Sequence, residues 1–296
     1  MNSMQITTPL SRKAVLVSVN ISQWTARKLD RKVTDETNRK YHAADDAGRY
    51  NKLLIASEHL AELTGMVSKA RMLHYKMTQP WADDGPRILP NALFSKFSDE
   101  FRTLKREFND AADRFCAAYP AFVEERKKAL NGLFNDGDYP SADDIRSKFN
   151  LDLTILPFPD AADFRSELDD DTVAEIRAQL QVTTSTVVDK AMAHTVERIV
   201  SVVGHMANKL TAYSNRAPGE LGGVFRDSLV ENVRELADLL PAFNLVGDAK
   251  LDEIAKRIKA ELCTEDAKSL RENDGAREAV QKSADEIVAA VSGLFG

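Results

Sequence analysis

The stretch that decides the fold is NALFSKFSDEFRTLKREFNDAADRFCAAY, which spans residues 91–119. Its apolar side chains recur at alternating intervals of three and four residues. They are Phe94, Phe97, Phe101, Leu104, Phe108, Ala111, Phe115 and Ala118. A repeat of 3.5 residues is that of the a and d positions of a coiled coil. The stretch therefore predicts a long helix with one buried apolar face, here called the phenylalanine seam.

Helical periodicity continues on both sides of this seam. Pro120 is expected to break the seam helix and to begin the next one. Residues from about Asp169 to Tyr213 predict a second long helix, in which the β-branched run Thr183–Thr186 is the weakest part. Shorter helices are expected at residues 22–33, 47–64, 66–77, 120–133, 224–240, 251–262 and 264–291, with caps at Ser22, Ser141, Asp248 and Thr264, a stop at Pro241 and a turn at Pro218–Gly223.

Two short stretches predict strands instead. Apolar residues alternate with other residues over 15–21 and again over 151–156. Pro157 and Pro159 end the second stretch, because proline cannot continue a ladder of hydrogen bonds. An isolated strand is unstable, so we expect the two strands to pair with each other across the intervening sequence.

Together these patterns predict a mainly α fold: long antiparallel helices in a bundle with coiled-coil-like packing, plus a small two-stranded β element. The prolines and the acidic run Asp169–Asp171 place a boundary near residues 157–170. We expect an N-terminal helical half, 1–160, that contains both strands, and a C-terminal half of long helices, 161–296. These halves are either separate domains or parts of one continuous domain, and the oligomeric state stays open.

The composition is typical of an intracellular globular protein, with 43% hydrophobic and 29% charged residues. The two cysteines, Cys116 and Cys263, suit neither a disulfide framework nor a zinc site. Residues 1–13 lack the apolar core of a signal peptide, and no apolar run is long enough to span a bilayer. We therefore expect a cytoplasmic protein that does not bind membranes.

The sequence contains no recognisable catalytic or cofactor-binding motif. None of the five histidines pairs with another His or Cys at metal-ligating spacing, and phosphate-binding loops and nucleophile elbows are missing. Most acidic pairs fall at expected helix starts, where capping and the helix dipole favour them. We expect no catalytic residue, cofactor or metal, although an active site assembled from scattered residues would leave no local motif.

Basic residues concentrate near the N-terminus. The chain has a net charge of −6, but residues 1–90 carry 14 Lys and Arg against 9 Asp and Glu. Arg27 and Arg31 are four residues apart on an expected helix, and so are Lys28 and Lys32. They would form one basic stripe near Trp24, which suits a phosphate backbone with a stacked base. The alternative is a solvated face that pairs with the acidic C-terminal half.

A second candidate surface is the loop PWADDGPRILP, residues 80–90. Three prolines and a glycine make it a stiff, non-helical connection that is long for a helical hairpin. Trp81 and Arg87 are of the types most often found as interaction anchors. The loop is therefore either a partner-binding element or a plug, in which Trp81 is buried and Arg87 pairs with Asp83 or Asp84.

Three stretches carry a resemblance to a known family: LVSVNISQWTARKLDRKVTDE at 16–36, PWADDGPRILPNALF at 80–94 and FRDSLVENVRELADLLPAFNLVGD at 225–248. They resemble an uncharacterised family of phage and bacterial proteins, and the resemblance runs from about residue 12 to 262. Members of that family are often encoded near a MoxR-type AAA+ ATPase, sometimes with a von Willebrand A-type protein. The resemblance implies no catalytic residue and names one candidate partner.

These observations favour a non-enzymatic, phage-type helical protein that acts by binding a protein partner. The resemblance makes a MoxR-type AAA+ ATPase the first candidate, and Trp81 and Arg87 are the candidate partner-binding residues. The alternative is a nucleic-acid-binding accessory protein that uses Arg27, Lys28, Arg31 and Lys32. An enzyme whose active site is assembled from scattered residues is the third hypothesis.

Overall fold

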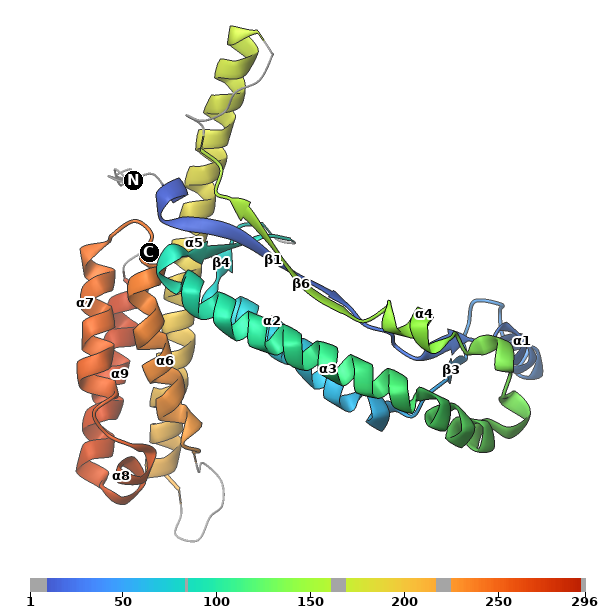
Figure 1. Ribbon diagram of the computed structural model, residues 1–296. Coiled ribbons are helices and arrows are strands. Elements are labelled where there is room, and N and C mark those ends of the chain that lie inside the picture. The colour runs from blue at the N-terminus through green and yellow to red at the C-terminus, as the bar shows by residue number, and fades with distance from the viewer. Residues whose placement is uncertain (1–9, 83–84, 161–168, 217–224, 294–296) are drawn as a thin grey trace. The chain divides into compact units, whose positions relative to one another are not determined.

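The computed structural model describes residues 10–82, 85–160, 169–216 and 225–293 (Figure 1). The fold is mainly helical, as the sequence predicts, and two of its helices are very long. Helix α3 (Asn91–Leu130) has 40 residues and α5 (Asp170–Ser214) has 45. The chain divides into two compact units. Unit 1 is built from residues 1–17, 77–95 and 155–296, and unit 2 from residues 18–76 and 96–154.

Four strands form an antiparallel sheet in the order β4-β5-β1-β6. They are β1 (Ala14–Ser22), β4 (Gln79–Pro80), β5 (Arg87–Pro90) and β6 (Asn150–Pro157). The predicted placement of 15–21 and 151–156 in one sheet is confirmed. The expected two-stranded element is wrong, because the proline-rich loop supplies β4 and β5. Proline is tolerated in β4 because that strand lies at the edge of the sheet.

Unit 1 is a bundle built around α5 (Figure 1). A short 3₁₀ turn at Leu10–Arg12 precedes β1. The other helices of the unit are α6 (Ser228–Phe243), α7 (Ala249–Arg257) with a π-helical turn at Ile258–Leu262, α8 (Ala267–Glu272) and α9 (Asp274–Ser292). Helix α5 packs along α9 and α6. Its predicted apolar repeat makes this contact, because Ile199, Val203, Met206 and Leu210 are all fully buried.

Unit 2 combines an antiparallel helix pair with a small two-stranded sheet. The small sheet pairs β2 (Arg27–Leu29) with β3 (Asn51–Leu53), and α1 (Arg31–Lys40) lies between them in sequence. A 3₁₀ turn, η2 (Ser57–Leu60), leads into α2 (Ala61–Met77), which packs beside α3. Two more 3₁₀ turns, η3 (Asn131–Leu133) and η4 (Asp136–Asp138), and the short helix α4 (Ala142–Arg146) lead to β6.

The phenylalanine seam from Phe97 onward forms the core of unit 2, whereas the prediction that Phe94 is buried is wrong, because Phe94 is 36% exposed. Phe97 and Phe108 are fully buried, and Phe101 is only 4% exposed, as the period predicts. Phe115 makes edge-to-face contacts with Trp24 and with Phe149, which lies just before β6. The seam therefore joins α3 to segments from both ends of the unit.

Two prolines do not end helices where the sequence suggested. Pro120 lies inside α3, which continues for ten more residues, and Pro241 lies inside α6, which continues to Phe243. A proline inside a helix removes one hydrogen bond to the carbonyl four residues earlier. In α3 the flanking aromatic residues Phe115, Tyr119 and Phe122 continue to pack with one another and their neighbours. This packing keeps the helix continuous through Pro120.

The N-terminal helices differ most from the sequence-based expectation. Ser22 ends β1 instead of capping a helix, and residues 27–29 form a strand. The helix expected at 47–64 is wrong, because residues 51–53 are β3 and α2 begins only at Ala61. Gly65 is part of α2 and does not interrupt it.

Cap residues were predicted with mixed success. Ser141 accepts a hydrogen bond from the Asp144 amide, and Asp248 caps α7, both as predicted. The cap at Thr264 is wrong, because Asp266 caps α8 and Asn273 caps α9. Helix α5 passes through Thr183–Thr186 without a break. The turn expected at Pro218–Gly223 lies outside the described residues.

The compact units relate to the predicted halves in a specific way. Unit 2 lies entirely within the predicted N-terminal half, and the predicted C-terminal half, 161–296, lies within unit 1. Unit 1 also takes residues 1–17, 77–95 and 155–160 from the first half. The chain therefore passes from one unit to the other four times.

Candidate functional site

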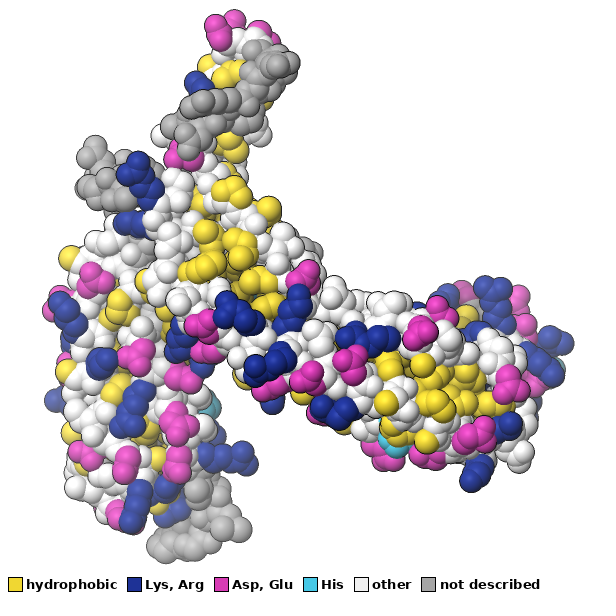
Figure 2. Space-filling view, in the orientation of Figure 1, with side chains coloured by type: hydrophobic (Ala, Val, Ile, Leu, Met, Phe, Trp, Pro, Cys, Tyr) yellow, Lys and Arg dark blue, Asp and Glu magenta, His cyan; other side chains and the backbone are white. Residues whose placement is uncertain are grey.

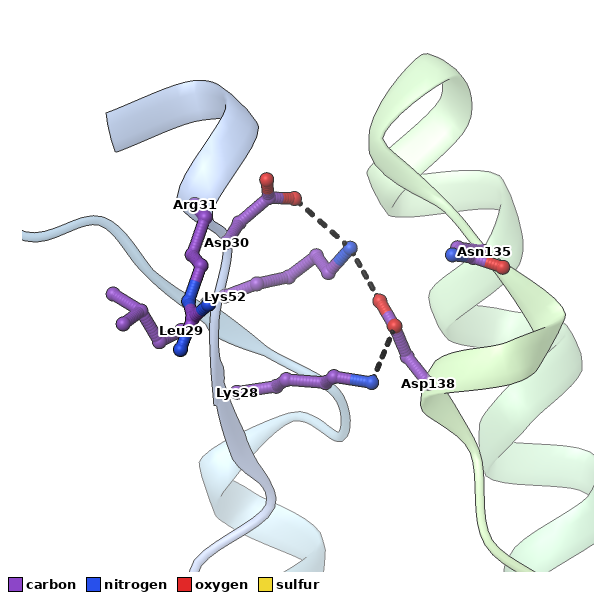
Figure 3. Close-up of a pocket in the computed structure, with 7 residues that line it drawn as sticks. All are labelled: Lys28, Leu29, Asp30, Arg31, Lys52, Asn135 and Asp138. Atoms are coloured by element: carbon purple, nitrogen blue, oxygen red, sulfur yellow. Dashed lines mark hydrogen bonds and ion pairs between the residues drawn. The ribbon is translucent and has the colours of Figure 1, made fainter. Parts of the chain in front are cut away.

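The pocket in Figure 3 contains two of the four residues proposed to bind nucleic acid, Lys28 and Arg31. It lies in unit 2 between the β2–β3 pair and η4, and has a volume of about 570 Å³. At its centre the Lys52 ammonium lies 2.5 Å from an Asp138 oxygen and 3.2 Å from an Asp30 oxygen. Lys52 also donates a hydrogen bond to the Leu133 carbonyl. Lys28 approaches the second Asp138 oxygen at 2.9 Å.

These four residues, Lys28, Asp30, Lys52 and Asp138, are called the Lys52 charge cluster below. The side chains of Lys52 and Asp138 are only 4% and 7% exposed, whereas that of Lys28 is 49% exposed. Burial alone would lower the pKa of Lys52, but hydrogen bonds to Asp138 and Asp30 outweigh it and raise the pKa. Every buried charge of this cluster is therefore paired, which is the condition for tolerating such charges inside a protein.

The two carboxylates of the cluster respond in the same direction. A hydrogen bond from the Val33 amide, assisted by Lys52, lowers the pKa of Asp30. Burial would raise the pKa of Asp138, but hydrogen bonds from Lys52 and Lys28 leave it lowered. Both groups are therefore ionised at neutral pH. The cluster attaches the β2–β3 pair to the turns that follow α3. Its charged groups form ion pairs with one another.

The predicted basic stripe does not exist as one helical surface. Arg27 and Lys28 lie on β2, and Arg31 and Lys32 begin α1, with Asp30 between them as the N-cap. Within α1, Asp35 and Glu36 follow Arg31 and Lys32 at a spacing of four residues. Figure 2 shows basic and acidic side chains interspersed at this end of unit 2. The expectation failed because a capping aspartate starts a new element in the middle of the stripe.

The aromatic residue expected beside the stripe is also not available for base stacking. Trp24 is buried at 8% exposure, against Phe115 and Tyr119. The most exposed aromatic side chain that the structure describes in this region is instead Tyr41, at 70% exposure, with the Lys40 ammonium 5.7 Å from its ring centre. Tyr41 follows the last residue of α1 and was not identified from the sequence.

In unit 1, Trp81 lies between the two alternatives, because its side chain is only partly buried. Its ring meets that of Phe158 edge to face, with 5.1 Å between centroids, and it packs on the hydrophobic core of the unit. Arg87 is half-buried in β5 and donates to the hydroxyl and the carbonyl of Thr78. The predicted pairing of Arg87 with Asp83 or Asp84 lies outside the described residues.

Arg87 also contributes to a positive environment inside unit 1. Burial lowers the pKa of His194, and the charges of Arg198 and Arg87 lower it further. Gln79, which pairs with Ile88 next to Arg87 in the β4–β5 hairpin, is fully buried and donates to the Thr195 hydroxyl of α5 and the Phe243 carbonyl of α6. The hairpin is therefore attached to α5 and α6 by its polar residues as well as by Trp81. Trp81 and Arg87 are both partly buried, so their role as partner-binding residues stays a prediction.

A groove in unit 2 was not recognised from the sequence. It runs between α2 and α3 and has a volume of about 560 Å³. The lining residues are Lys69, Met72, Leu73 and Lys76 of α2 with Asp99, Glu100, Thr103, Leu104 and Glu107 of α3. Leu73 and Leu104 are buried at its base, whereas Met72 is 64% exposed. Tyr75, one helical turn beyond Met72, is 59% exposed.

The two walls of this groove carry opposite charges. The α2 wall has only basic charged residues, Lys69 and Lys76, and the α3 wall has only acidic ones, Asp99, Glu100 and Glu107. A signal for the groove does exist in the sequence. The buried face of α2 repeats from Leu63 through Val67 and Ala70 to Leu73, and Met72 and Tyr75 do not belong to it.

Comparison of the chain with protein-family models, with curated proteins and with solved structures gives no match. The family resemblance and the partner that it implies therefore stay predictions. Among the described residues, no helix combines the length and the apolar character needed to cross a lipid bilayer.

Proposed function

We propose that this protein acts by binding a partner protein through the α2–α3 groove of unit 2, and not by catalysis. The observation that carries the proposal is the exposed apolar surface of Met72 between walls of opposite charge. Contiguous exposed apolar surface rimmed by charged residues marks protein-binding sites, and Tyr75, 59% exposed one helical turn along α2, extends the surface of Met72. The prediction that Trp81 and Arg87 bind a partner stands beside this proposal, because both side chains are partly buried in unit 1 and partly exposed.

The groove geometry fits one kind of occupant, an amphipathic helix of the partner. The apolar face of that helix would lie on Met72, Leu73 and Leu104, as in other helix-in-groove complexes. Its acidic flank would face Lys69 and Lys76, and its basic flank would face the acidic wall of α3. Because the walls differ in charge, they favour one direction of insertion over the reverse.

The resemblance described above makes a MoxR-type AAA+ ATPase the first partner to test. Titration calorimetry of the full chain with such an ATPase from the same genome should give a saturable complex. Met72→Glu should weaken it at least about tenfold, since the new carboxylate would be buried against the partner's apolar face. Val182→Glu is the matched control, because Val182 is 66% exposed on α5 in unit 1. An equal effect of both changes, or none from Met72→Glu, would remove the groove from the proposal.

Two designed peptides test the groove without a known partner. Both are helices with a leucine face, one with glutamate and lysine on the flanks proposed here and the other with the two flanks exchanged. The first should bind more tightly, and the double variant Lys69→Glu, Lys76→Glu should reverse the preference. Equal binding of the two peptides would contradict the proposed orientation.

Nucleic-acid binding remains a second candidate because of one observation, the exposed ring of Tyr41 beside Lys40. An exposed aromatic ring near basic residues can stack on a base while the cations contact phosphates. Binding of this kind falls steeply with salt. We expect little binding at physiological salt, given the net charge of −6. A salt-sensitive complex with single-stranded DNA that Tyr41→Ala and Arg27→Glu both weaken would promote this candidate.

A further inference from the structure

Three side chains with metal-ligating atoms converge on unit 2, and none of them lines the groove or the Lys52 pocket. Glu58 and His59 lie in η2, and Glu125 lies in the C-terminal part of α3. One ligand atom from each lies within 4.8 Å of the others. Neither composition nor local motifs revealed this arrangement, because Glu125 lies 66 residues after His59 in the sequence.

The position of the His59 ring is fixed by contacts within the protein. It stacks on Phe122 with 3.9 Å between ring centroids and an interplanar angle of 13°. Its Nε2 atom lies 3.0 Å from a Glu125 oxygen, so the ring nitrogen points toward the other donors. Phe122 and Glu125 are three residues apart on α3 and therefore share a face of that helix. One helical turn thus supplies both the support for the ring and the second ligand.

The donor set indicates which ions would bind. A neutral imidazole nitrogen with two carboxylate oxygens suits Zn²⁺ and related first-row transition metals, whereas Mg²⁺ and Ca²⁺ favour oxygen ligands alone. The two carboxylates also provide two negative charges for a dication. Ligands around a tetrahedral Zn²⁺ ion are roughly 3.4 Å apart at bond lengths of about 2.1 Å. The exposed side chains of Glu58 and Glu125 can close the remaining distance by changing rotamer.

We propose that Glu58, His59 and Glu125 form a binding site for a divalent transition metal, with Zn²⁺ as the preferred ion and water in the open coordination position. The ion pair between His59 and Glu125 involves only two of the three side chains. Glu58 adds a third donor atom to the set. The bound ion would join the turn before α2 to the C-terminal part of α3. Because three ligands leave a position open, the site would exchange its ion and its water with solvent.

The test uses the full chain with zinc chloride and, separately, magnesium chloride. Calorimetry should show one Zn²⁺ bound per chain, and excess Mg²⁺ should not displace it. Tetrahedral Co²⁺ in place of Zn²⁺ should give a visible absorption band that disappears with the site. His59→Phe is the main variant, because phenylalanine keeps the ring that stacks on Phe122 and removes the ligand. It should weaken Zn²⁺ binding at least about tenfold.

Two further comparisons make the result decisive. Glu58→Gln and Glu125→Gln should each weaken Zn²⁺ binding, since a neutral amide replaces a charged ligand. His205→Phe is the control, because His205 is exposed on α5 in unit 1 and should leave the affinity unchanged. Equal Zn²⁺ affinity in His59→Phe and the wild type would overturn the proposal, as would a titration without a single saturable site. An unchanged affinity in Glu58→Gln would refute the three-ligand set.

Discussion

Lys52 is the residue on which attachment of the β2–β3 pair depends most, because its ammonium bridges two carboxylates while almost fully buried. Replacing it by methionine keeps the volume of the side chain but leaves Asp30 without its cation and Asp138 with only the half-exposed Lys28. Removal of one partner from a buried ion pair typically costs about 3–5 kcal/mol. We therefore expect Lys52→Met to lower the free energy of unfolding by about that amount in chemical denaturation at pH 7.

The control for Lys52 is Lys105→Met. Lys105 pairs with Asp152 at 2.8 Å, but the two side chains are 41% and 54% exposed. Solvent screens such a pair, so this change should cost less than about 1 kcal/mol. Similar losses in the two variants would show that burial of the Lys52 charge cluster is not what stabilises it.

Acid should reduce the difference between the wild type and Lys52→Met. The pKa values of Asp30 and Asp138 are lowered in the folded state. Their contribution to stability is therefore complete above the unfolded pKa, near about pH 4, and is lost as pH falls through the lowered values. The pKa of Lys52 is raised, so its contribution is lost only in strongly alkaline solution. Denaturation curves at pH 7 and pH 3 should show a larger gap between the two proteins at pH 7.

A variant of Trp81 can distinguish a role in packing from a role in partner binding. Because its ring packs on Phe158 and the core of unit 1, Trp81→Ala should destabilise the protein by about 2–3 kcal/mol. This is less than the 3–5 kcal/mol of a fully buried tryptophan. The same change should leave the affinity of the α2–α3 groove for its peptide unaltered. Intact stability together with a weakened complex would identify Trp81 as an interaction anchor.

At the scale of elements, α3 contains a testable defect. Pro120 is exposed and lies inside the helix, where it removes one backbone hydrogen bond. Pro120→Ala supplies the missing amide, so we expect a gain of about 1 kcal/mol or more after the lost rigidity of proline in the unfolded chain is subtracted. Thermal unfolding measures the gain, and Pro140→Ala, which lies outside any helix, is the control. A lower melting temperature for Pro120→Ala would mean that the proline stabilises a local bend in α3.

Helices whose apolar repeat extends over many turns could be predicted from the sequence, whereas the three-residue strands β2 and β3 could not. The phenylalanine seam and α5 each repeat their apolar residues over several turns, so the pattern itself specifies the buried face. Strands β2 and β3 contain three residues each, and most of them are charged or polar. They form because their backbones pair with each other and because Lys52 reaches a turn some eighty residues away. The residues of β2 and β3 themselves contain no signal for this contact with the Leu133 carbonyl.

The candidate sites follow the same rule. The Lys28 and Arg31 surface was sought on one helix, but Asp30 divides it between a strand and a helix. The α2–α3 groove could have been suspected from Met72 and Tyr75, which do not belong to the buried repeat of α2. Its acidic wall could not have been added, because the pairing of α2 with α3 depends on tertiary packing. For the same reason the His59 site is invisible until η2 and α3 are brought together.

At the scale of the whole molecule, the chain cannot be cut cleanly at the boundary suggested by its prolines. Leu10, Leu16 and Ile88 belong to the same hydrophobic core as α5 and α6. A fragment of residues 1–160 would expose these side chains, and a fragment of residues 161–296 would expose their partners. We therefore expect the two fragments to aggregate when expressed singly and to copurify as a complex when expressed together. Two soluble, monomeric fragments would establish the predicted halves as separate domains.

The order of β1 in the sheet has a consequence for synthesis on the ribosome. β1 is synthesised before both of its neighbours in the sheet, β5 and β6, which begin only at Arg87 and Asn150. At translation rates of about 5–20 residues per second, β1 waits roughly 6–26 seconds for β6. Until β5 is synthesised, both edges of this largely apolar strand are unpaired, and one edge stays unpaired until β6 follows. Unpaired strand edges are the condition under which nascent chains aggregate. The phenylalanine helix can form locally meanwhile, so the growing chain is at greatest risk at β1.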